Sequence, residues 1–88
     1  MTKEKINQKI ILLGGMLNNL RKLGGKIVTK KYGNSVTITI NGLTESTKTI
    51  VVETTKISSI NRAYKILARL WVKVLDEREY KKALKTLF

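Results

Sequence analysis

The chain has 88 residues, with 18 lysines and arginines against six acidic residues, and it contains no cysteine, histidine or proline. This length fits one domain, and 42% apolar residues are too many for an intrinsically disordered chain. The missing cysteine excludes disulfides and thiolate metal sites, and the missing histidine removes the usual general base and the commonest metal ligand. We therefore expect no enzymatic activity, no catalytic residues, no bound metal and no cofactor.

The formal net charge of +12 is the strongest functional signal in the sequence. A compact domain with this excess attracts polyanions, and nucleic acid is the usual one. The alternatives are an anionic membrane surface, an acidic protein partner, and a charge that serves only solubility. The longest apolar run, Ile10–Leu17, is far shorter than the ~20 residues of a membrane span, and no signal-peptide cleavage site follows it. We expect a cytoplasmic protein, associated with the nucleoid if it binds DNA, and no membrane partner.

The first predicted element is a helix from about Lys3 to Leu23. Its apolar residues recur at steps of four and three, which places them on one face: Ile6, Ile10, Leu13, Leu17 and Leu20. Gly14-Gly15 in the middle indicates either a break in the helix or the close approach of another backbone. Gly24-Gly25 is typical of a helix end.

A β-hairpin is predicted next, from the segments Lys26–Tyr32 and Ser35–Asn41. Gly33-Asn34 between them is a strong signal for a two-residue turn. From Val36 to Ile40, apolar residues alternate with threonines, so one face of the strand is apolar and the other polar.

A two-residue turn also fixes the register of the hairpin. It pairs Lys30 with Thr37 and Val28 with Thr39, and it places these side chains with Tyr32 on the polar face. A looser turn then leads to a third strand, about Lys48–Thr55. An antiparallel meander with one polar face needs cover on the other face, which the helices supply.

The second predicted helix runs from a cap at Ser58 or Ser59 to about Leu75. Tyr64 and Trp71 lie on its apolar side and are predicted to anchor the core rather than to stack on bases. The opposite side carries basic residues at steps of three, four and four, which form one continuous stripe: Arg62, Lys65, Arg69 and Lys73.

Beyond Leu75 the helical period continues on a different face. The apolar residues there fall on the side that was basic before: Tyr80, Leu84, Leu87 and Phe88. Asp76 followed by Glu79 indicates either a short new helix with its own cap or one long helix with a second apolar face. In both cases residues 76–88 form a C-terminal helical extension with a docking surface, attached to a single domain whose core spans residues 1–75.

The expected fold class is α+β with the order α-β-β-β-α, a three-stranded antiparallel meander with both helices packed on one face. From Gly25-Lys26 through Leu75, this element order resembles the double-stranded RNA-binding domain. Thr39-Ile40-Asn41-Gly42 resembles the second strand and turn of that family. Lys56 to Lys65 occupies the place of its lysine-rich helix start, with Ser58-Ser59 where the family has a lysine pair. This resemblance implies contact with duplex RNA.

The composition resembles a second group, the small basic accessory proteins of archaeal replication and chromatin, such as small subunits of a DNA polymerase holoenzyme. The features that carry this resemblance are the Lys- and Ile-rich, Cys-free composition and the basic helix from Arg62 to Lys73. It implies a role beside a larger enzyme.

The sequence thus predicts a non-enzymatic protein that binds DNA or RNA through phosphates, largely without sequence specificity. The basic stripe is the predicted site, and Lys30, Lys31 and Lys56 are predicted to extend it. The alternative is an accessory subunit that docks on a larger replication or transcription enzyme through the apolar face of the extension. A homodimer through the same face is a further option.

Overall fold

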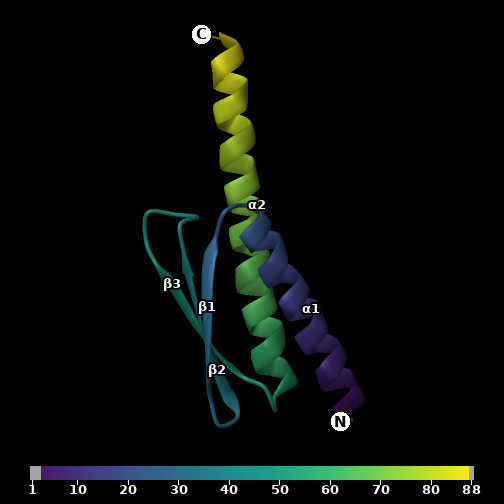
Figure 1. Cartoon of the computed structure of the whole chain (residues 1–88). Coiled ribbons are helices and arrows are strands. Elements are labelled where there is room, and N and C mark those ends of the chain that lie inside the picture. The colour runs from purple at the N-terminus through teal and green to yellow at the C-terminus, as the bar shows by residue number, and fades with distance from the viewer. Residues whose placement is uncertain (1–2, 88) are drawn as a thin grey trace.

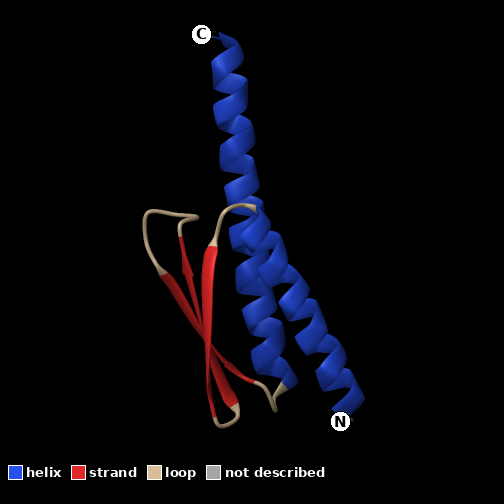
Figure 2. Ribbon diagram, in the orientation of Figure 1, coloured by secondary structure: helices blue, strands red, loops and turns tan. Residues whose placement is uncertain are grey.

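The computed structural model describes residues 3–87, which form a helix, three strands and a second helix (Figure 1). The elements are α1 (Lys3–Lys22), β1 (Lys26–Tyr32), β2 (Ser35–Asn41), β3 (Lys48–Glu53) and α2 (Ile57–Leu87). The strands form one antiparallel sheet in the order β1-β2-β3. Both helices lie on one side of this sheet, and its other face is open (Figure 2). The predicted α+β class and element order are confirmed.

The helix α1 is uninterrupted and turns one apolar face to the rest of the domain. Its buried residues are Leu13, Met16, Leu17 and Leu20. A Cβ atom placed on Gly14 or Gly15 would meet nothing within 4 Å. The two glycines therefore neither break the helix nor admit a close backbone, the two outcomes that the sequence left open.

The predicted glycine pair ends α1. Gly24 has a φ of +97°, and its N–H donates to the carbonyl of Arg21 at 2.9 Å, while the N–H of Gly25 donates to the carbonyl of Leu20 at 3.0 Å. This is the Schellman arrangement, which satisfies carbonyls at the end of a helix. Gly25 is also closely surrounded, because a Cβ there would lie 2.9 Å from the Leu20 oxygen and 3.0 Å from Cδ1 of Leu43. The chain can turn into β1 at this point only with a residue that lacks a side chain.

The β1–β2 hairpin has the predicted two-residue turn and the predicted register. Gly33 has a φ of +58° and Asn34 has a negative φ, which is the type II′ pattern that matches the twist of the strands. Val28 lies opposite Thr39 as expected. The buried side chains of the inner sheet face are Ile38, Ile40 and Val52. On the open face of the sheet, large apolar side chains are exposed, among them Val28, Tyr32 and Val51.

The third strand is shorter than predicted, since β3 ends at Glu53 rather than at Thr55. The N–H and the Oγ of Thr54 both donate to the carbonyl of Asn34 at 2.9 Å. These bonds fasten the connection before α2 to the hairpin turn. Thr54 and Thr55 therefore belong to a turn, although their composition is typical of a strand.

The predicted cap of α2 is wrong. The carbonyl of Lys56 accepts the first helical bond from the N–H of Ile60 at 3.2 Å, so Ser58 and Ser59 already lie in the first turn. The Oγ of Ser59 instead accepts a bond from the N–H of Glu53 at 2.8 Å. The hydroxyl joins the helix to the end of β3, a role that local spacing does not reveal.

One continuous helix, α2, replaces the alternative of a new helix that starts at Asp76. Its buried residues are Ile60, Ala63, Leu67, Leu70 and Val74. Tyr64 and Trp71 are half-buried and pack against this core, as predicted. The C-terminal part of α2 projects past the sheet and α1 (Figure 1). Before it does so, Nη2 of Arg78 donates to the carbonyl of Leu23.

The close surroundings of Gly25 lead to a test with a built-in control. Gly25→Ala places a Cβ against the Leu20 carbonyl and the Leu43 side chain, and we expect it to lower the free energy of unfolding by about 1–3 kcal/mol. Gly15→Ala adds the same methyl group to an open helical position, and we expect a gain of about 1 kcal/mol. Urea unfolding followed by circular dichroism measures both. Equal effects of the two substitutions would contradict the packing described for Gly25.

The end of the buried face at Val74 leads to a second test. Deletion of residues 76–88 removes no buried residue of the described chain and one described hydrogen bond to the domain, from Arg78. We expect the free energy of unfolding to fall by no more than about 1 kcal/mol. Thermal melts of the full and shortened chains provide the comparison. An unfolded shortened chain would show that residues beyond Val74 belong to the core.

Candidate nucleic-acid interface

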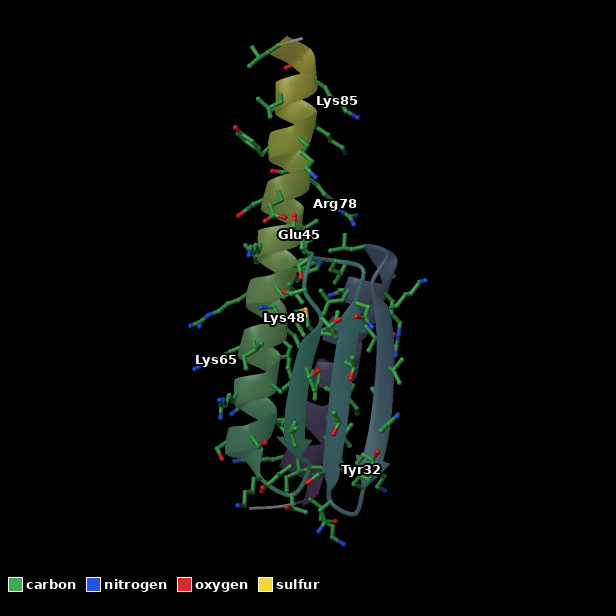
Figure 3. All side chains as sticks on the ribbon, turned by 90° about the vertical axis from the view of Figure 1, so that its left-hand side faces the viewer. Tyr32, Glu45, Lys48, Lys65, Arg78 and Lys85 are labelled. Carbon is green, nitrogen blue, oxygen red and sulfur yellow. The ribbon has the colours of Figure 1, made fainter. Side chains whose placement is uncertain are left out.

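The predicted basic stripe lies on the side of α2 that faces away from its buried residues. Arg62, Lys65, Arg69 and Lys73 are all exposed, and Figure 3 shows Lys65 on the side of the helix turned away from the sheet. Because Ile60, Leu67 and Val74 fix the buried side of α2, the helical period sets the direction of the stripe. No residue of the stripe forms an ion pair with any acid in residues 3–87. All four cations are therefore available to an external anion.

A groove runs beside this stripe, between α2 and the edge strand β3. One part, of about 260 Å³, is lined by Lys48, Ile50, Ile66, Arg69, Leu70 and Lys73. An adjoining hollow of about 240 Å³ shares Ile50 and Ile66 with it and reaches Arg62. We call these two parts the α2–β3 groove. It has an apolar floor and a basic rim.

Lys48 is a member of this site that the sequence did not suggest. Its place in β3 is in phase with Ile50 and Val52, so it points to the covered side of the sheet, where it reaches the rim beside Arg69 and Lys73. Figure 3 shows Lys48 between the sheet and α2. The alternation of β3 could have indicated its face. The nearness of α2 depends on tertiary packing and could not be read from the sequence.

Lys30 and Lys31 do not adjoin the stripe. They lie on β1, and α2 packs beside β3, two strands away across the sheet. Two strand spacings amount to about 10 Å. Lys30 is on the open face opposite Thr37, as predicted, and Lys31 points to the other face. Both lysines lie on the far edge strand, one on each face of the sheet, because the meander places the first and third strands on opposite edges.

Lys56 is the residue before the first residue of α2, so it lies nearer to Arg62 than to the other residues of the stripe. Its Nζ is 3.1 Å from Oε2 of Glu53, and both side chains are largely exposed. An exposed pair of this kind contributes only about 0–1 kcal/mol, so the ammonium group can exchange the carboxylate for another anion. Lys56 therefore adds less positive charge to the site than an unpaired lysine does.

The stripe ends where acidic residues begin. Asp76 and Glu77 follow Lys73 by one helical turn and line a shallow depression with it. Glu45, in the loop between β2 and β3, lines a neighbouring hollow with Glu77 and Lys81. The row of cations on this side of α2 thus ends at Lys73.

The arrangement is suited to binding anions. Within residues 3–87, no three acidic side chains gather closely enough to hold a metal ion. None of the helices in that range is both apolar and long enough to cross a bilayer.

Comparison of the chain with protein-family models, with curated proteins and with solved structures finds no match. The function of the chain is therefore inferred from its own geometry.

Proposed function

We propose that the protein binds nucleic acid through the phosphates, with the stripe on α2 and Lys48 as the contact surface. The observation that carries this proposal is the row of exposed cations along one helix face, beside a groove whose rim is also basic. Arg62, Lys65, Arg69 and Lys73 have no ion-pair partner among the described acids. Binding of a polyanion neutralises them and releases its condensed counterions.

The length of the stripe suits a phosphate backbone. Arg62 and Lys73 are separated by three helical turns, which is about 16 Å along the axis at ~1.5 Å per residue. One strand of a duplex presents a phosphate every ~3.4 Å along its axis, so the stripe spans roughly five phosphates. Contacts of this kind fix position and carry little sequence information. The proposed activity is therefore non-enzymatic binding with little sequence preference.

A second hypothesis concerns the extension. Tyr80 and Leu87 are exposed and Leu84 is half-buried, all beyond the end of the core, while Phe88 lies outside the described residues. A surface of this kind would let the protein act as an accessory subunit of a larger replication or transcription enzyme. The stripe would then add positive charge beside the nucleic-acid channel of that enzyme.

The stripe leads to a quantitative test of binding. Four phosphate contacts predict that log K falls with log salt at a slope of about −3 to −4, from roughly −0.9 per neutralised duplex phosphate. Replacing Arg62, Lys65, Arg69 and Lys73 with Gln should weaken binding to every sequence by a similar factor and flatten the slope. Fluorescence anisotropy with labelled duplex DNA, single-stranded DNA and duplex RNA at several salt concentrations measures both quantities.

A matched variant separates a localised site from diffuse attraction. It replaces four cations outside the stripe with Gln and so carries the same net charge: Lys3, Lys5, Lys81 and Lys82. We expect this variant to lose much less affinity than the stripe variant. Equal losses would rule out the localised site and leave only general attraction by the +12 charge.

A further inference from the structure

The outward side of α2 carries a regular series of exposed positions along most of its length. They follow one another at alternating steps of four and three residues, the spacing with which two helices pair. All are exposed: Arg62, Ile66, Arg69, Lys73, Asp76, Tyr80, Ala83 and Leu87. We call this series the outer seam. It extends over more than three heptads, and four of its eight positions are charged: Arg62, Arg69, Lys73 and Asp76.

The outer seam combines exposed apolar side chains with charges of both signs. Ile66, Tyr80 and Leu87 are 37%, 65% and 76% exposed, and Val72 beside the seam is 49% exposed. Apolar residues that recur on one side of a helix and face solvent mark a surface that another molecule covers. In the part of α2 that packs on the domain, the seam borders β3 and remains exposed, since Ile66, Arg69 and Lys73 also line the α2–β3 groove.

The two halves of this side have opposite charge. The first half is cationic, from Arg62 to Lys73. In the second half, Asp76 lies on the seam and Glu77 and Glu79 flank it. At about 100° per residue, three cations of the extension fall on the opposite side of the helix, Arg78, Lys82 and Lys85. Lys81 lies beside Glu77 and lines the same hollow. The outward side is therefore basic at one end and acidic and apolar at the other.

We propose that α2 pairs with α2 of a second copy of the chain, antiparallel, about a two-fold axis between Lys73 and Asp76. This pairing places Lys73 against Asp76 of the partner subunit and Arg69 against Tyr80 of the partner subunit, each twice. The first contact is an ion pair and the second a cation–π contact. Further along, Ile66 meets Ala83 of the partner subunit.

The antiparallel direction follows from the charges. A parallel pair would place Lys73 against Lys73 and Asp76 against Asp76, and like charges in facing positions destabilise a helix pair. An antiparallel pair joins each basic half to an acidic and apolar half. The helices overlap over residues 62–87, about 39 Å at ~1.5 Å per residue.

This dimer goes beyond the proposed binding of nucleic acid and does not depend on it. The two surfaces share Arg62, Arg69 and Lys73, which lie both in the stripe and in the outer seam. A polyanion and a second copy therefore compete for these three cations. Binding of nucleic acid at this site favours the monomer.

Disulfide trapping tests the direction and register of the pair without nucleic acid. The chain has no cysteine, so introduced thiols are the only ones present. In I66C/A83C the two thiols of one chain are about 25 Å apart along the helix and cannot join each other. In the proposed dimer the thiol at position 66 of each chain faces the thiol at position 83 of the other chain. We expect I66C/A83C to oxidise to a covalent dimer and A83C alone to remain monomeric.

A charge exchange tests the central contact by sedimentation equilibrium of the uncross-linked chain. D76K sets a lysine against Lys73 of the partner subunit, and we expect the dimer to weaken by about tenfold or more. K73D/D76K restores opposite charges and the original net charge, and we expect affinity within a few-fold of the unaltered chain. E4K makes the same charge change as D76K at an exposed position in the first turn of α1, away from the seam, and its effect should be small.

The proposal is overturned if the unaltered chain remains a monomer at millimolar concentration, or if A83C alone forms the covalent dimer. It is also overturned if E4K weakens the dimer as much as D76K. A monomer with exposed Tyr80 and Leu87 would instead favour docking on a different protein. Neither result bears on the salt dependence of nucleic-acid binding, so the two proposals fail independently.

Discussion

Burial of one face of α2 is the interaction on which the rest of this structure depends. Leu67, in the middle of that face, is fully buried, as is Leu20 from α1. The helix packs against α1 and β3, and it thereby joins the first helix to the edge of a sheet whose inner face would otherwise be exposed. Removal of this apolar area from water is the dominant favourable term for a domain of this size. The sequence determines the order of the helices and strands, but their packing into one domain requires the buried face of α2.

The position of the candidate site follows from the same constraint. The buried residues between Ile60 and Val74 face inward. The helical period then directs Arg62, Arg69 and Lys73 outward, beside the edge of β3. The buried face ends at Val74, but no glycine or proline stops the helix there, and α2 continues to Leu87. The extension therefore consists of helix without a core to cover. Its outward side keeps the direction of the stripe and changes its chemistry from basic to acidic and apolar.

Local signals in the sequence predicted the parts of the fold that local physics decides. Gly33-Asn34 and the alternation after it gave the hairpin and its register, because a tight turn and a half-buried strand each have one favoured solution. Gly24-Gly25 marked the end of α1 for a similar reason.

The errors in the predicted structure arose where tertiary contacts decide the conformation. Ser59 bonds the end of β3 rather than capping α2, and Thr54 bonds the hairpin turn rather than extending β3. The four residues of the stripe were predictable from period alone, whereas Lys48 and the separation of Lys30 and Lys31 depend on which strand lies beside α2. The binding of nucleic acid and the resemblance to known families stay predictions.

The central claim, that nucleic acid is bound along the rim of the α2–β3 groove, is tested most directly by nuclear magnetic resonance. Backbone amide shifts are followed while a short DNA duplex, and separately a single strand, is added to dilute labelled protein. We expect the shifts to change along α2 from Arg62 to Lys73 and in β3 near Lys48, with little change on β1. Changes that centre on Lys30, Lys31 and Tyr32, or that spread evenly over the surface, would contradict it.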